Sequence, residues 1–179
     1  MLTLLITGGS QGSGTLNRAA RESWPLFRKA GVPVRILHQT GRAAFETLRE
    51  QFAASGIEGE IVPFIADMPG AFQGADLVVC RSGAGAVSEL AAAGKPSILV
   101  PFPFAADDHQ ARNAEAMERA GAARLIVDSN FDGETLAAAA IELARASGVL
   151  ERMGEAARQF AHPGAARRSA DILEEVARG

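Results

Sequence analysis

Short apolar runs alternate with longer helical segments along almost the whole chain, and this alternation limits the folds open to it. The runs cover 2–7, 33–38, 60–64, 76–80, 97–101 and 122–127. Continuous apolar runs of this length are typical of strands buried on both faces of a parallel sheet. Helix-like segments occupy 15–30, 42–54, 84–93, 108–120 and 134–146. The sequence therefore predicts an α/β fold: a Rossmann-like, doubly wound parallel sheet of about six strands with helices on both faces.

The helix ends and the tail fit one domain over residues 1–179, without a linker or an internal repeat. Four of the helical segments are followed by a glycine, where a left-handed residue is expected to end a helix: Gly31, Gly56, Gly94 and Gly121. The tail from about residue 149 is predicted to be helical, with an apolar stripe made of Ile172, Leu173 and Val176.

Composition argues against several classes of protein. Hydrophobic residues make up 47% of the chain and charged residues 22%, which disfavours disorder. The net charge is −3 and no block of lysine and arginine occurs, so a nucleic acid is a poor candidate partner. Every apolar run is far shorter than the roughly 20 residues that cross a bilayer. The single cysteine, Cys80, ends an apolar run, which predicts a buried thiol in a reducing, cytosolic compartment.

A first glycine-rich turn, GGSQGSG at 8–14, follows the first predicted strand. Glycines let a backbone approach a ligand closely, and the next helix offers free amides to an anion; a tight turn without a ligand is the alternative. A P-loop would need a lysine where Gly14 stands. A dinucleotide site would need a glycine in place of Asn17 and an acidic residue near Gln39. Binding of ATP or NAD is therefore disfavoured.

A second turn, CRSGAGA at 80–86, follows the fourth predicted strand. Glu89 lies about one turn into the next helix. There its carboxylate either accepts hydrogen bonds from ribose hydroxyls or is present only because the positive end of the helix dipole stabilises it. Arg81 has two candidate partners as well, a ligand phosphate or a structural carboxylate. The sequence leaves both alternatives open.

A third segment, PFPFAADDHQ at 101–110, leads into another helix. Asp107, Asp108 and His109 invite a metal hypothesis, but no further ligand follows at helical spacing, so we expect no metal there. Asp108 is equally suited to be an N-cap, and Gln110 to bind sugar hydroxyls. The strand-end His38 has two alternatives, to line the site or to make ordinary hydrogen bonds, of which the second is the more common, and no serine sits in a nucleophile elbow. These segments favour a binding surface over a self-sufficient active site.

Five motifs occur in the order GGSQGSG, HQTG, FIADM, ADLVVCRSGAGAVSELAAAGKPSILVPFP and DDHQARNA. Together they resemble the C-terminal half of MurG-type glycosyltransferases, in glycosyltransferase family 28, across essentially the whole chain. The resemblance implies one half of a GT-B architecture. It also implies hexosyl transfer: GlcNAc moves from UDP-GlcNAc to lipid I, which gives lipid II for peptidoglycan, cell shape and division.

The resemblance further implies which residues meet the donor UDP-GlcNAc. It places the diphosphate near Ser10, Gln11 and Gly12, the uracil against the Phe64–Ile65 backbone, and the ribose on Glu89. The second turn would contribute Arg81, Ser82, Gly83 and Ala84, and the GlcNAc would meet His109 and Gln110. Two positions depart from the pattern: His109 replaces a common glutamine, and Ala86 replaces a frequent threonine.

In this family the N-terminal half supplies the acceptor site, the membrane-facing patch and a catalytic histidine, and nothing before Leu2 matches it. We therefore expect no catalytic residue, cofactor or metal in this chain, and no turnover by it alone. The full-length protein would meet lipid I and the inner face of the cell membrane through the missing half. Three alternatives are a stand-alone donor subunit of a split GT-B enzyme of lipid-linked glycan synthesis, a non-catalytic nucleotide-sugar-binding module, and a nucleotide-sugar epimerase.

Overall fold

The computed structural model describes residues 1–161 and 164, and its elements follow the predicted alternation. The strands are β1 (Leu2–Thr7), β2 (Val34–Gln39), β3 (Glu58–Val62), β4 (Leu77–Cys80), β5 (Ser97–Leu99) and β6 (Ala123–Leu125). The α-helices are α1 (Gly14–Lys29), α2 (Phe45–Ser55), α3 (Met68–Gly74), α4 (Ala84–Ala93), α5 (His109–Arg119), α6 (Gly133–Arg145) and α7 (Val149–Arg158). Two short 3-10 turns, η1 (Ala106–Asp108) and η2 (Asp128–Asn130), complete the described elements.

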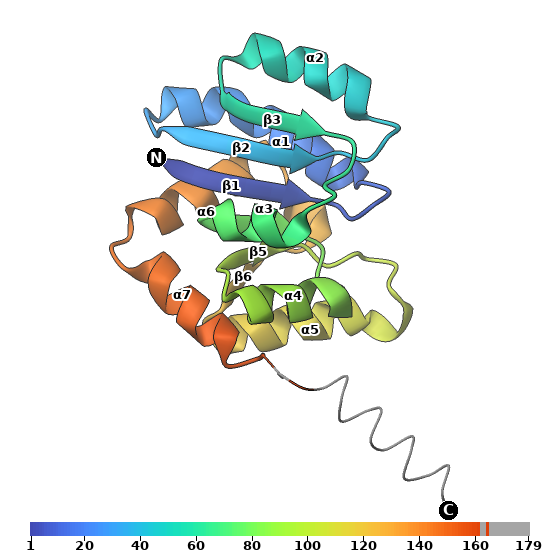
Figure 1. Cartoon of the computed structure of the whole chain (residues 1–179), viewed down its shortest axis with the longest axis vertical. Coiled ribbons are helices and arrows are strands. Elements are labelled where there is room, and N and C mark those ends of the chain that lie inside the picture. The colour runs from blue at the N-terminus through green and yellow to red at the C-terminus, as the bar shows by residue number, and fades with distance from the viewer. Residues whose placement is uncertain (162–163, 165–179) are drawn as a thin grey trace, which may run out of the picture.

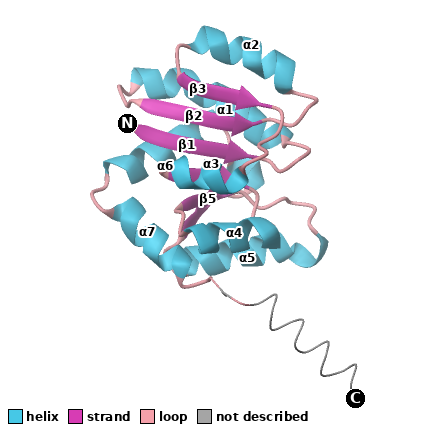
Figure 2. Cartoon of the chain, viewed as in Figure 1, coloured by secondary structure: helices cyan, strands magenta, loops and turns pink. Residues whose placement is uncertain are grey.

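All six strands form one parallel sheet in the order β3-β2-β1-β4-β5-β6 (Figure 2). Leu4 of β1 stands opposite Ile36 of β2 on one side and Leu77 of β4 on the other. This order confirms the predicted Rossmann-like sheet.

Alternate residues of the central strands feed two separate cores. Leu4 and Ile6 pack with α1, α2 and α6 on one face of the sheet. Leu5 packs on the other face with apolar side chains of α3, α4 and α5. The helix α7 contributes Met153 to the first core and Ala157 to the second, and it lies toward the end of the sheet where the strands begin (Figure 1). The opposite end, where the strands finish, is therefore left to the loops.

The predicted elements match with small shifts and one omission. The glycines at 31, 56, 94 and 121 all have positive φ, between 61° and 75°, as predicted. The strand predicted at 60–64 is β3, which begins at Glu58; Gly59 pairs there with Ile36, and a Cβ on it would lie 1.9 Å from the Ile36 carbonyl oxygen. The helix α3 was not predicted. The predicted tail helix begins as α7, while its apolar stripe lies outside the described residues.

Candidate functional site

The three predicted turns lie together at the carboxyl ends of the strands (Figure 1). They leave β1, β4 and β5, which are consecutive neighbours in the sheet. The strand order reverses between β1 and β4, and in an open α/β sheet ligands bind in the crevice at that point. The structure thus brings the predicted binding segments to one edge.

The β1–α1 turn is shaped by two glycines with positive φ. Gly9 has a φ of 81° and Gly12 a φ of 77°, a region that favours glycine. The Gly9 N–H donates to Thr7 Oγ1 at 3.2 Å, and the Gly12 N–H donates to the Gly9 carbonyl at 3.0 Å. Ser10 and Gln11 are exposed between them. The turn therefore presents these two side chains at the sheet edge.

The glycines of this edge differ in what surrounds them. A Cβ on Gly12 would lie 2.0 Å from the Thr40 carbonyl oxygen, so this glycine lets the turn pack against the β2–α2 loop. A Cβ on Gly14, Gly83 or Gly85 would meet no heavy atom within 4 Å. Those three stand at the amino ends of α1 and α4, where backbone amides lack intrahelical partners. Both helix ends are open to an incoming anion.

Gln39 joins two of the predicted binding segments, and sequence reasoning missed this role. Its side chain is buried at the end of β2. The Nε2 group donates to the Gly9 carbonyl at 2.7 Å and to Thr7 Oγ1 at 3.2 Å, while Oε1 accepts from the Ile65 N–H at 2.7 Å. The residue that stands in place of a dinucleotide-binding acid thus holds the β1–α1 turn against the β3–α3 loop.

His38 does not reach the site; it is fully buried beneath α1. Its Nε2 atom lies 3.0 Å from Asn17 Oδ1, and Asn17 Nδ2 donates to the Thr40 carbonyl at 3.0 Å. Burial lowers the pKa of His38 from 6.5 to about 4, so the imidazole is neutral at pH 7. The expected ordinary hydrogen bond is confirmed, and the residue supports the β2–α2 loop from below.

Arg81, for which the sequence left two partners open, is held by protein atoms. Its Nη1 lies 2.5 Å from Asp128 Oδ1 and donates to the carbonyls of Val100 (3.2 Å) and Pro101 (3.1 Å). Its Nη2 donates to Ser13 Oγ at 2.9 Å. The structural carboxylate is therefore Asp128, a residue that sequence reasoning did not single out.

Ser82 is buried and faces the protein interior. Its hydroxyl donates to the Gln110 carbonyl at 2.8 Å, and its own carbonyl accepts from Asn113 Nδ2 at 3.0 Å. Gln110 in turn accepts the Phe102 N–H on Oε1 at 3.0 Å, which leaves its amide NH₂ to act as a donor. These bonds fix the start of α5 against the β4–α4 turn.

Glu89 and Cys80 lie close to one another but differ in exposure. The Cys80 thiol is buried, as predicted, and burial together with the nearby Glu89 carboxylate raises its pKa to about 12. Glu89 is exposed on α4. Its carboxylate is therefore available at the edge, near the end of β4, whereas the thiol is inert.

The β5–α5 loop presents aromatic rings and two unusual backbone conformations. Phe102 and Phe104 are 43% and 83% exposed, with ring centroids 5.6 Å apart in an edge-to-face arrangement. Asp107 and Asp108 adopt φ of 50° and 51°. Asp108 takes the predicted N-cap position of α5, but its side chain makes no capping hydrogen bond. His109 is exposed next to it, and within the described residues no group of three metal-ligating side chains occurs.

A cavity of about 530 Å³ opens on the β2 and β3 side of this edge. Ser10, Gln11, Arg42, Ala43 and Phe64 line it, and we call it the Arg42 cavity. Phe64 is 56% exposed, and Arg42 is exposed as well. Sequence reasoning missed Arg42, although its place directly after the HQTG motif was a usable signal.

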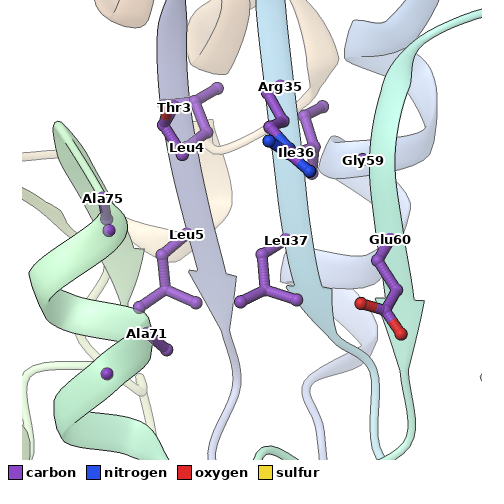
Figure 3. Close-up of a pocket in the computed structure, with 12 residues that line it drawn as sticks. Thr3, Leu4, Leu5, Arg35, Ile36, Leu37, Gly59, Glu60, Ala71 and Ala75 are labelled. Carbon is purple, nitrogen blue, oxygen red and sulfur yellow. The ribbon is translucent and has the colours of Figure 1, made fainter.

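A second hollow, of about 450 Å³, lies on the sheet face away from these turns. Figure 3 shows Leu5 and Leu37 pointing into it, with Ala71 of α3 on one side and Glu60 on the other. It lies between the seven-residue helix α3 and residues of β1, β2 and β3. None of the predicted binding residues lines it.

Comparison with known proteins agrees with this geometry. A transferase from Solibacter usitatus, UDP-N-acetylglucosamine--N-acetylmuramyl-(pentapeptide) pyrophosphoryl-undecaprenol N-acetylglucosamine transferase, is 69% identical over 99% of this chain. The protein of the same name from Halorhodospira halophila is 47% identical over 98% of the chain. The crystal structure of Acinetobacter baumannii MurG superposes with a TM-score of 0.87 at 35% identity, over 97% of this chain and 50% of that one.

The chain spans about half the length of the curated relatives it matches, 48% and 49% for the two transferases. Within the part of the chain that the structure describes, no helix has the length and apolar character needed to span a membrane. The sequence model of the glycosyltransferase family 28 C-terminal domain matches residues 3–172. Because this match covers nearly every residue and the fold agrees with it, the chain belongs to the glycosyltransferase family 28 C-terminal domain family.

Proposed function

We propose that residues 1–179 form the donor-binding domain of a transferase that moves GlcNAc from UDP-GlcNAc to lipid I, forming lipid II in peptidoglycan synthesis. The observation that carries the proposal is that the amino ends of α1 and α4 both open at the carboxyl ends of the neighbouring strands β1 and β4. The reaction that names the two similar transferases supports this proposal.

The diphosphate is proposed to bind between these two helix ends. Gly14 of α1, and Gly83 and Gly85 at the start of α4, leave room for phosphate oxygens beside free backbone amides. The positive ends of two helix dipoles then stabilise the charge on the leaving UDP, which removes the need for a metal ion. Arg42 adds a positive charge from the adjacent cavity.

The uracil is proposed to pair with the carbonyl group of Ile65. The N–H of Ile65 already donates to Gln39, so the carbonyl is the group left to read the base edge. Uracil has an N3–H that donates to a carbonyl, whereas cytosine has an unprotonated N3 that does not. Phe64, 56% exposed, provides an apolar surface for the ring. This arrangement favours UDP over CDP and ADP.

The remaining contacts are proposed to come from side chains on α4 and α5. The Glu89 carboxylate accepts hydrogen bonds from the ribose hydroxyls. The amide NH₂ of Gln110, together with His109, faces the GlcNAc hydroxyls. Lipid I, the catalytic base and the attachment to the inner face of the membrane are proposed to belong to the part of the longer relatives that this chain does not cover.

Isothermal titration calorimetry with UDP-GlcNAc, UDP, CDP and ADP tests the proposal. We expect UDP-GlcNAc and UDP to bind, and CDP and ADP to bind at least about tenfold more weakly, since cytosine N3 and adenine N1 are unprotonated and cannot donate to the Ile65 carbonyl as uracil N3–H does. Binding is expected to survive EDTA. Equal affinity for ADP and UDP would contradict the uracil assignment, and loss of binding on chelation would contradict the metal-free diphosphate site.

A further inference from the structure

Arg81 is enclosed by partners from three other segments that meet at the sheet edge. Its guanidinium group bonds to Ser13 before α1, to the carbonyls of Val100 and Pro101 after β5, and to Asp128 after β6. The side chain is 15% exposed, and the Phe102 ring lies 5.6 Å from its central carbon. Its hydrogen-bonding fork is directed at protein oxygens.

Asp128 and Ser13 extend this arrangement to the first turn of α1. Asp128 accepts from Arg81 on Oδ1 and from Thr15 Oγ1 on Oδ2 at 3.2 Å. Ser13 is the N-cap of α1, and its hydroxyl accepts from the Leu16 N–H at 3.4 Å as well as from Arg81. Two points at the amino end of α1 are therefore tied to the end of β4. We call Arg81, Asp128, Ser13 and Thr15 the Arg81 cluster.

The charge of Arg81 is already matched. The Arg81–Asp128 ion pair is largely enclosed, with side-chain exposures of 15% and 20%, so it is less screened than a surface pair. A phosphate would have to displace Asp128 to gain the same contact. By contrast, the exposed Arg42 lines the neighbouring cavity. Of these two arginines, Arg42 is the one placed to meet an anion.

We infer that Arg81 is a positioning residue that does not touch the donor. Together with Asp128 it fixes the amino end of α1 relative to the β4–α4 turn, so that two sets of backbone amides converge on one diphosphate. The inference rests on the proposed function for its ligand, but the tie between α1 and β4 stands independently of any ligand. It assigns roles to Asp128, Ser13 and Thr15, and it removes Arg81 from the set of donor contacts.

Hydrogen exchange of the ligand-free chain tests the tie itself. We expect Arg81→Ala and Asp128→Asn to speed exchange about tenfold or more at the amides of Leu16 and Asn17, because the first turn of α1 loses its anchors. Amides of α2 should be unaffected. Arg124→Ala is the matched control, since it breaks a bidentate ion pair with Glu142 at 2.8 Å, away from the turns. Unchanged exchange at Leu16 and Asn17 would overturn the inference.

Affinity measurements separate positioning from direct contact. We expect Arg81→Ala, Arg81→Lys and Asp128→Asn each to weaken UDP binding about tenfold, with uridine binding and the salt dependence of UDP affinity unchanged. The Arg81→Ala, Asp128→Asn double variant should bind no more weakly than either single variant. Lysine should fail because a single ammonium cannot reproduce the guanidinium fork.

A direct phosphate contact gives the opposite pattern. Asp128→Asn would free Arg81 and tighten UDP binding, Arg81→Lys would keep most of the affinity, and Arg81→Ala would flatten the salt dependence. Any of these results overturns the inference. If the unmodified chain fails to bind UDP, the proposed function fails. The hydrogen-exchange result alone then decides whether Arg81 and Asp128 fix the amino end of α1 relative to the end of β4.

Discussion

The two sides of the carboxyl edge differ in how their charged groups are used, paired with protein atoms on one side and exposed to solvent on the other. The β1–α1 turn contributes residues to both sides. On the β4 to β6 side, the Arg81 cluster pairs its charged groups with protein atoms. On the β2 and β3 side, the Arg42 cavity exposes a cation, an aromatic ring and polar side chains to solvent. Ser13 belongs to the first region, while Ser10 and Gln11 belong to the second. One short turn thus combines a fixed end with an end available to a ligand.

This contrast teaches where sequence motifs mislead. Arg81 sits in the most specific motif of the chain, yet its bonds are internal. Arg42 sits beside a plainer motif and lines the open cavity. The place of an arginine in a binding motif therefore does not determine whether its side chain meets a ligand or the protein itself.

Gly12→Ala should cause the largest loss, because Gly12 holds the turn against the β2–α2 loop. Its φ is 77°, and an added Cβ would lie 2.0 Å from the Thr40 carbonyl. We expect the free energy of unfolding to fall by more than about 3 kcal/mol in urea denaturation. Gly9→Ala is the control, with a φ of 81° but open space, and should cost only about 1 kcal/mol. Equal losses would show that the loop contact is unimportant.

Lowering the pH should reduce the stability that buried His38 contributes below the β2–α2 loop. The folded pKa of His38 is lowered from 6.5 to about 4, so the unfolded chain binds more protons between these pH values. The stability contributed by neutral His38 is present above pH 6.5, falls as the pH drops, and is lost below about pH 4, an effect of at most about 3 kcal/mol. Urea denaturation at several pH values across this range should show that the free energy of unfolding changes less with pH in His38→Gln than in the unmodified chain. The same change with pH in both proteins would assign the effect to other groups.

Glu89→Ala tests the proposed contact between the exposed Glu89 carboxylate and the ribose, on the same side of the edge as the Arg81 cluster. We expect about a tenfold loss of UDP affinity by calorimetry, since charge-assisted bonds to the ribose are removed at a solvent-exposed site. Affinity for 2′,3′-dideoxyuridine diphosphate should stay near that of the unmodified chain. Glu50→Gln, an exposed acidic position on α2, is the control. Unchanged UDP affinity in a folded Glu89→Ala protein would leave Glu89 with only a helix-dipole role.

Arg42→Ala should have the smallest effect, because an exposed charge acts through screened electrostatics. We expect about a threefold loss of UDP affinity at low salt that shrinks as ionic strength rises. Arg49→Ala on α2 removes an exposed arginine that is paired with Glu46 and should leave affinity unchanged. A salt-independent loss at Arg42 would instead indicate a direct, desolvated contact with the ligand.

The fold was largely predictable because its strands are buried and its helices end in glycine. The segments β1 and α4 have the predicted bounds. The helix α3 was missed because Pro69, Gly70 and Gly74 interrupt seven residues; its signal was Asp67, whose Oδ1 accepts from the Gly70 N–H at 3.0 Å. Charged residues in the edge strand β3 displaced its predicted start.

The site was predictable only where local sequence determines it. Glycines next to strands marked the turns, and the resemblance selected the residues placed at the sheet edge. The partner of Arg81 lies 47 positions away, and Gln39 joins segments 30 and 26 positions away. Such contacts depend on the order of the strands in the sheet, which sets β1 beside both β2 and β4 although β2 and β3 separate β1 from β4 in the chain. No local pattern carries that information.

We place a uridine diphosphate sugar between the amino ends of α1 and α4. Titration of the ¹⁵N-labelled chain with UDP-GlcNAc, followed by amide chemical shifts, tests this placement. We predict that the amides of Gly14, Thr15, Gly83 and Gly85 shift together at one affinity, with Ile65 responding to the base. Shifts confined to the hollow lined by Leu5 and Leu37, or at only one of the two helix ends, would contradict the claim.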